Sequence, residues 1–145
     1  MAALTFFNAF KEDLSEKAHN LQADAIKIML TNTAPVATNS VKADLVEIAS
    51  VANGYTAGGT TAAITSSVQT SGVYKLILAD VTFTQAGANA VGPFRYAVLY
   101  NDTQTAPVKP LIGFYDYGSA LTLAALSGES FLVDLDGTNG VLTLS

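Results

Sequence analysis

The chain has 145 residues, the usual size of one domain, so we expect a single domain over residues 1–145 with one hydrophobic core. Hydrophobic residues make up 50% of the chain and charged residues only 13%, against about 25% charged in an average globular protein. Cysteine is absent, which excludes disulfides, thiolate metal sites and thiol nucleophiles. So little charge favours a protein whose surface is partly covered by a partner.

The charge balance and hydropathy also restrict the classes of partner. Seven basic and twelve acidic residues give a formal net charge of −5 and are spread without runs. Such a surface repels phosphate backbones, so we expect no direct nucleic-acid binding. No apolar run approaches the roughly 18 residues of a membrane helix, and we expect no membrane span. The first ten residues lack the basic region of a secretory signal, so no export signal is expected.

Near the N-terminus, apolar residues recur at three- and four-residue steps with charged residues between them. This spacing predicts one short amphipathic helix within an N-terminal segment, 1–22. The apolar positions are Phe6, Phe7, Phe10, Leu14, Ala18 and Leu21. Two interpretations stay open: a helix that lies on the body of its own domain, and an arm that docks on a neighbouring molecule.

After the predicted helix, the period of the apolar residues changes to two. Ile26, Ile28 and Leu30 alternate with residues of the opposite face, which predicts a strand from Asp24. A turn-forming stretch follows at 32–39, and the glycines of 53–59 are interpreted as a flexible loop. Further strands are expected at 73–78, 81–84, 94–100, 111–117, 121–123, 131–136 and 141–144.

Two sequence features mark expected boundaries between these strands. Gly92-Pro93 is expected to break the chain before the strand at 94–100. The stretch 136–140 carries both Asp-Gly and Asn-Gly, dipeptides that favour tight hairpin turns. A C-terminal hairpin that joins 131–136 to 141–144 is therefore predicted.

Eight to ten short strands, without alternating long helices, predict an all-β fold. The expected architecture is a jelly roll or β-sandwich with one short amphipathic helix near the N-terminus.

The residues that carry enzyme chemistry are scarce. His19 is the sole histidine, no Gly-x-Ser-x-Gly elbow accompanies it, and we interpret it as a surface residue. Asp134, Asp136 and Asn139 around Gly137 match part of a calcium-binding loop, but a turn is the preferred interpretation. We therefore predict no enzyme activity, no catalytic or metal-binding residues and no cofactor.

Four segments resemble a known class of virion protein: LTNTAPVATN (30–39), NGYTAGG (53–59), GPFRYAVLYND (92–102) and DLDGTNGVLTL (134–144). Together they are similar to the capsid cement or decoration proteins of tailed bacteriophages, of the type found on Bordetella phage heads. The likeness covers most of the chain, although no single motif is diagnostic.

The resemblance implies a jelly-roll-like protein, paired as a homodimer, that clamps neighbouring major capsid proteins on the outer surface of the virion's icosahedral capsid. Phe6, Phe7 and Phe10, with the loop around Tyr55, are the predicted contact residues. The alternative is a tail or host-recognition module, because jelly rolls also serve as lectins. In that interpretation Tyr55, Tyr96 or Tyr115 would form an exposed ledge that stacks sugars, whereas ordinary sheet packing is the simpler explanation of these tyrosines.

Overall fold

The structure is a computed structural model that describes residues 3–49 and 52–145. Within these residues it contains one α-helix, α1 (Asn8–Ser15), and one 3₁₀ turn, η1 (Lys42–Asp44). The strands are β1 (Thr5–Phe6), β2 (Ile26–Thr31), β3 (Thr60–Thr61), β4 (Ile64–Thr70), β5 (Val73–Leu78), β6 (Val81–Thr84), β7 (Val91–Asn101), β8 (Leu111–Leu123), β9 (Ser130–Val133) and β10 (Leu142–Leu144). The predicted all-β sandwich class, with one short helix near the N-terminus, is confirmed.

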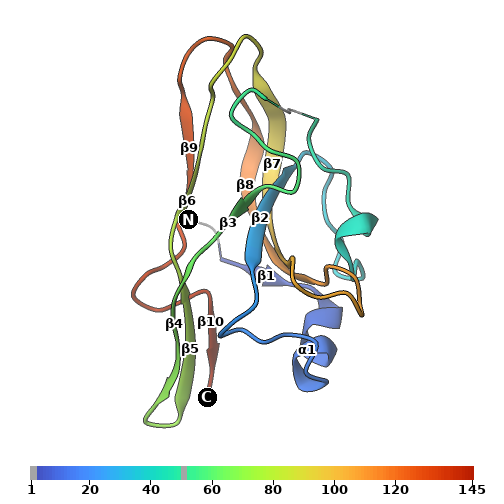
Figure 1. Ribbon diagram of the computed structural model, residues 1–145, viewed down its shortest axis with the longest axis vertical. Helices are drawn as coiled ribbons and strands as arrows, with labels where there is room; N and C mark the ends of the chain where they lie inside the picture. The colour runs from blue at the N-terminus through green and yellow to red at the C-terminus, as the bar shows by residue number, and fades with distance from the viewer. Residues whose placement is uncertain (1–2, 50–51) are drawn as a thin grey trace.

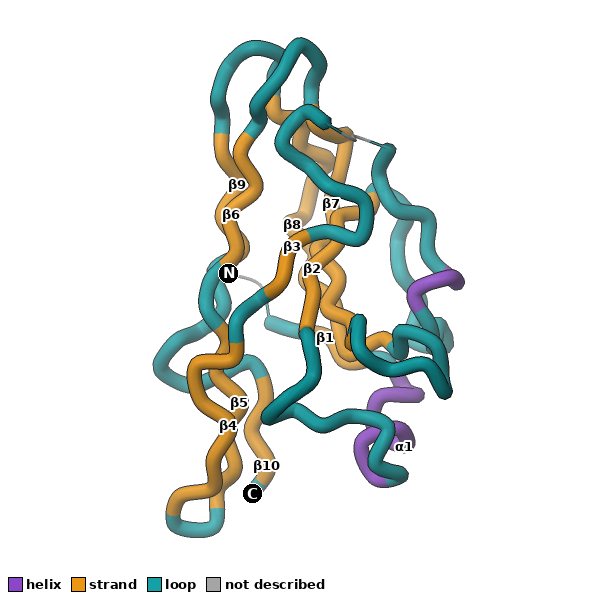
Figure 2. The backbone as a smooth tube through the Cα atoms, in the orientation of Figure 1, coloured by secondary structure: helices purple, strands orange, loops and turns teal. Residues whose placement is uncertain are grey.

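The strands form two layers of antiparallel sheet. One layer is a five-stranded sheet in the order β1-β8-β7-β2-β3. The other consists of a three-stranded sheet, β10-β5-β4, and a two-stranded sheet, β6-β9. Figures 1 and 2 show these two smaller sheets one above the other along one side of the five-stranded sheet, with α1 on the other side. The main core includes Phe10 and Leu142, so both ends of the chain contribute to it.

Strand β2 lies inside the five-stranded sheet and is buried on both faces. Ile26, Ile28 and Leu30 face the main core, as their alternation predicts. Met29 faces the opposite way, into a second apolar cluster that includes Phe7. The N-terminal segment and the η1 region cover this outer face, which is why a central strand reads as nearly continuous apolar sequence.

Helix α1 is shorter than the apolar spacing predicts. Phe6 belongs to strand β1, which pairs with β8, and the helix starts at Asn8. The helix ends at Ser15 because Lys17 has a φ of 67°, in the left-handed region that a right-handed helix excludes. The extension of the helix toward Leu21 was therefore wrong, although Leu21 still packs into the main core.

The predicted C-terminal hairpin is wrong. Strand β9 pairs with β6, and β10 pairs with β5, so the strands flanking 136–140 belong to different sheets. The turn itself exists, because the Asp136 carboxylate accepts hydrogen bonds from the backbone N–H groups of Thr138 and Asn139. The Asp-Gly and Asn-Gly signals therefore mark a connection between two sheets.

Gly92-Pro93 does not break the chain as expected. Strand β7 starts at Val91 and continues through this dipeptide to Asn101, with a register shift between Val91 and Phe94. Its partner β8 likewise joins the two strands expected at 111–117 and 121–123 into one. A bulge absorbs the glycine and proline within the strand, which a sequence pattern for regular strands does not reveal.

Candidate interaction surface

The three N-terminal phenylalanines are part of the protein's own packing. Phe7 and Phe10 are buried, and Phe6 is partly buried with its ring stacked 5.3 Å from that of Phe10. The Phe7 backbone N–H donates to the Ile112 carbonyl, which ties the segment to the five-stranded sheet. The described part of segment 1–22 thus lies on the body of its own domain. Of the three phenylalanines, only Phe6 leaves side-chain area for a partner in this conformation, and its role in an interface stays a prediction.

The loop around Tyr55 is held by a network of hydrogen bonds. Tyr55 is buried, and its hydroxyl donates to Glu47 Oε1 at 2.5 Å and accepts from the Leu30 N–H at 3.1 Å. Glu47 also accepts from the Gly58 N–H and forms an ion pair of 2.8 Å with Lys42. This network anchors the loop to β2, so the Tyr55 side chain packs inward and offers no exposed contact.

Glu47 is the residue of this network that sequence reasoning missed. Burial raises the pKa of a carboxyl group, but hydrogen bonds from Lys42, Tyr55 and Gly58 outweigh it and hold the pKa of Glu47 below its usual value. Burial, together with the hydrogen bond to Glu47, raises the pKa of Tyr55. In the sequence, Glu47 is a single acidic residue among the apolar residues Leu45, Val46 and Ile48, and this pattern does not indicate a hydrogen-bonding role.

The glycines of this loop serve close packing, contrary to their interpretation as a flexible loop. A Cβ on Gly59 would lie 1.8 Å from the Ile28 carbonyl oxygen, and one on Gly54 would lie 1.9 Å from that of Thr84. Both glycines also have positive φ values. The backbone therefore approaches its neighbours so closely that other residues do not fit.

The tyrosines proposed as a sugar-binding ledge do not form one. Tyr55, Tyr96 and Tyr115 are all buried, and sheet packing explains them. Burial, with smaller contributions from the charges of Asp136 and Asp134, raises the pKa of Tyr115 to about 12. The exposed-ledge prediction is therefore wrong.

His19 is buried rather than exposed, in contrast to its interpretation as a surface residue. Its Nδ1 lies 3.1 Å from the side-chain nitrogen of Asn101, which in turn donates to Asp24 at 2.6 Å. Burial lowers the pKa of His19 to about 4, despite the opposing charge of Asp24. The ring partner is an amide and not a serine or threonine hydroxyl, so this cluster lacks the geometry of an activated nucleophile.

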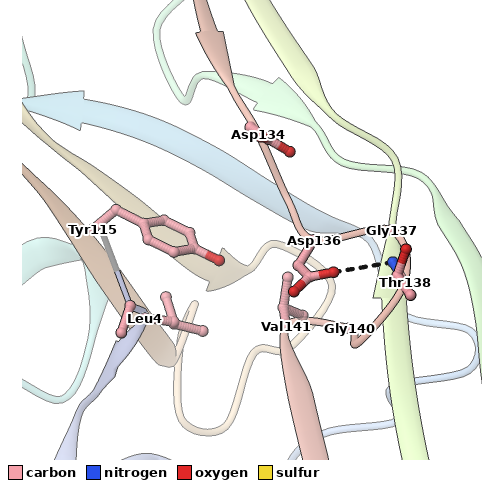
Figure 3. A pocket seen from close by; sticks show the side chains of 9 residues that line it. Leu4, Tyr115, Asp134, Asp136, Gly137, Thr138, Gly140 and Val141 are labelled. Carbon is pink, nitrogen blue, oxygen red and sulfur yellow. Dashed lines mark hydrogen bonds between the residues drawn. The ribbon is translucent and has the colours of Figure 1, made fainter. Parts of the chain in front are cut away.

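A hollow of about 540 Å³ lies beside the 136–140 connection (Figure 3). Tyr115 of β8 lines it, together with Asp134 and Asp136 of the segment that follows β9. Hydrogen bonds within the turn already engage both oxygens of the Asp136 carboxylate. Oδ1 accepts from two backbone N–H groups, and Oδ2 accepts from the Asn139 side chain at 2.9 Å. Those hydrogen bonds lower the pKa of Asp136. No group of three or more metal-ligating side chains occurs among the described residues.

Several exposed apolar side chains lie on strands β8 and β9 and on the loop between them. Tyr117 on β8 and Leu132 on β9 are each about half exposed, and Leu126 on the connecting loop is 81% exposed. Tyr117 and Leu132 line a shallow hollow of about 460 Å³ together with Leu121. We name these four residues the β8–β9 surface. Tyr117, Leu121 and Leu132 share one hollow, and grouped apolar side chains of this kind are typical of interaction sites, whereas single exposed ones are not.

Comparisons with protein-family models, with curated protein sequences and with solved structures find no match. Within the described residues, no helix is long and apolar enough to cross a membrane.

Proposed function

We propose that this chain is a structural binding protein of a tailed-phage virion. It acts as a cement protein that binds the outer surface of the capsid and clamps neighbouring major capsid proteins. The observation that carries the proposal is the β8–β9 surface, an exposed apolar region on a molecule with few charges. The resemblance of four sequence segments to capsid cement proteins supplies the class of partner.

The segments that carry the resemblance are mainly those that specify the architecture. Segment 53–59 contains the anchored Tyr55 and the closely packed Gly54 and Gly59. Segment 92–102 covers nearly all of strand β7, at the centre of the five-stranded sheet. The likeness therefore supports a shared fold, and the exposed surface supports a role in binding.

The proposed mechanism requires differential binding and no chemistry. A protein that binds the mature shell more tightly than the precursor stabilises the mature arrangement by that difference in free energy. The exposed side chains of Tyr117, Leu126 and Leu132 provide apolar area whose burial favours association, at about 25 cal/mol per Å². The net charge of −5 suits a protein on the outside of the shell, away from DNA.

The burial of Tyr55, Tyr96 and Tyr115 removes the feature that favoured the sugar-binding alternative. We therefore propose no second function.

The test is the copy number of this protein in purified virions, measured by quantitative mass spectrometry against the major capsid protein. A ratio close to one supports a cement protein spread across the shell. A few copies per particle would instead place the protein in the tail or at one vertex, and absence from virions would overturn a virion role. Either of the last two results refutes the proposal.

A further inference from the structure

Strand β4 is the longest end strand among the sheets of the described structure. It is the end strand of the sheet β10-β5-β4 and has seven residues, whereas the other end strands have between two and four. Its backbone pairs with β5 on one side, and no described strand pairs with it on the other. In Figure 2 the turn of the β4–β5 hairpin lies at one end of the molecule, beyond the other strands.

The edge lacks the usual protection against pairing. Natural edge strands carry charged residues or proline, are short, or are interrupted by bulges. β4 reads ITSSVQT, without charge or proline, and its one irregularity lies between Ile64 and Ser66. From Ser66 to Thr70 the strand pairs residue by residue with β5, so these five residues present a regular row of backbone groups.

Val68 lies at the centre of this regular stretch. Its side chain is 54% exposed, and it pairs across the sheet with Lys75 of β5. The Lys75 Nζ donates to the Thr138 carbonyl at 3.3 Å, so its ammonium group is turned toward the 136–140 connection. The centre of the free edge is therefore an exposed apolar residue without a charged side chain beside it on β4.

We propose that the β4 edge pairs antiparallel with the β4 edge of a second copy of this chain. With the two-fold axis at Val68, this residue lies opposite its own copy, Ser67 opposite Gln69, and Ser66 opposite Thr70. An antiparallel pair about a two-fold axis satisfies both edges with the same residues, so one chain supplies both halves of the contact. The pairing covers Val68 and brings no like charges together, although each copy carries a net charge of −5.

This inference deepens the proposed function, since it names the surface through which a clamp becomes bivalent. Its test uses the purified chain alone, so the two proposals can fail separately. The chain contains no cysteine, so Val68→Cys introduces a single thiol. Opposed residues of an antiparallel pair have Cα atoms about 4.5 or 5.5 Å apart, within the range of a disulfide.

The matched control is Val108→Cys. The exposed fraction of Val108 is 60%, similar to the 54% of Val68. Val108 belongs to the 102–110 loop, and Figure 1 shows this loop on the opposite side of the five-stranded sheet from β4. Under mild oxidation we expect Val68→Cys to form the disulfide-linked dimer at least about tenfold faster than the control, because pairing raises the effective thiol concentration. Equal rates for the two variants would overturn the proposal.

A second measurement keeps the proposal testable without a crosslink. Light scattering over a wide range of concentration should show a monomer–dimer equilibrium for the unmodified chain. Val68→Lys should raise the dissociation constant of the dimer at least about tenfold, because two lysines then face each other across the axis. Val108→Lys adds the same charge and should leave the dissociation constant of the dimer unchanged. A monomer at all concentrations, or equal effects of both lysines, would refute the pairing of β4 edges.

Discussion

Tyr55 shows how one hydroxyl group fixes a loop on strand β2 of the five-stranded sheet. Tyr55→Phe removes this hydroxyl and leaves the Leu30 N–H and a Glu47 oxygen without their partner. We expect the free energy of unfolding in urea to fall by about 1–3 kcal/mol, the cost of unsatisfied buried groups. Tyr117→Phe is the control: that tyrosine is half exposed, and its ring contact with Phe131 is kept, so a change within about 0.5 kcal/mol is expected. Equal losses would contradict the role of this hydroxyl.

His19 should make the stability of the fold depend on pH. Its pKa is about 4 in the folded chain against an ordinary value of 6.5, so the unfolded chain binds the proton more readily. The stability that neutral His19 contributes to the fold is thus fully present above pH 6.5 and is lost as the pH falls toward 4. We expect a loss of about 1–2 kcal/mol over this window, because nearby solvent screens part of the full effect.

The measurement for His19 is urea unfolding at several pH values between 7 and 4, for the unmodified chain and for His19→Asn. The asparagine side chain keeps an acceptor near the position of Nδ1, facing Asn101, but does not titrate. The pH dependence between 6.5 and 4 should therefore flatten in the variant. The lowered pKa of Asp24 adds a separate loss below its ordinary value of 3.8, which should remain. An identical slope in both proteins would exclude His19 as the cause.

At the scale of elements, the contact between β3 and β2 depends on a glycine. Gly59→Ala combines a φ of +76° with a Cβ only 1.8 Å from the Ile28 carbonyl oxygen, so the strands must separate. We expect a loss of about 3 kcal/mol or more in thermal or urea unfolding. Gly72→Ala has a similar φ, +84°, but its Cβ meets nothing within 4 Å, and should cost only about 1–2 kcal/mol. If both variants lost the same stability, backbone conformation and not close approach would explain Gly59.

The elements that the sequence predicted well are those whose burial follows a single local period. In β2 the residues that face the main core, Ile26, Ile28 and Leu30, recur with a period of two, although both faces are buried. In β9 buried Phe131 and Val133 alternate with exposed residues. The prediction of a C-terminal hairpin failed because a turn signal specifies the local bend but not the strand with which the next segment pairs. Glu47 and the β4 edge were missed for the same reason: their roles depend on which distant residues the fold brings beside them, and neither shows a period.

At the scale of the whole molecule, low charge and free apolar surface favour a protein that works in an assembly. If pairing through β4 makes the clamp bivalent, two simultaneous contacts with the shell raise the apparent affinity by about 10²–10⁴ over one contact. Val68→Lys should therefore weaken binding to undecorated, expanded shells by about a hundredfold or more, although the β8–β9 surface is unchanged.

This prediction can be checked by sedimenting the labelled protein with shells and measuring the bound fraction over a range of concentrations. Val108→Lys serves as the control for the added charge and should bind as the unmodified chain does. If Val68→Lys and Val108→Lys bound equally well while only the former was monomeric in solution, one contact would suffice for decoration and bivalency would be excluded. If both bound weakly, the added positive charge itself would be responsible, because a bivalency effect must separate a variant at the β4 edge from one in the 102–110 loop.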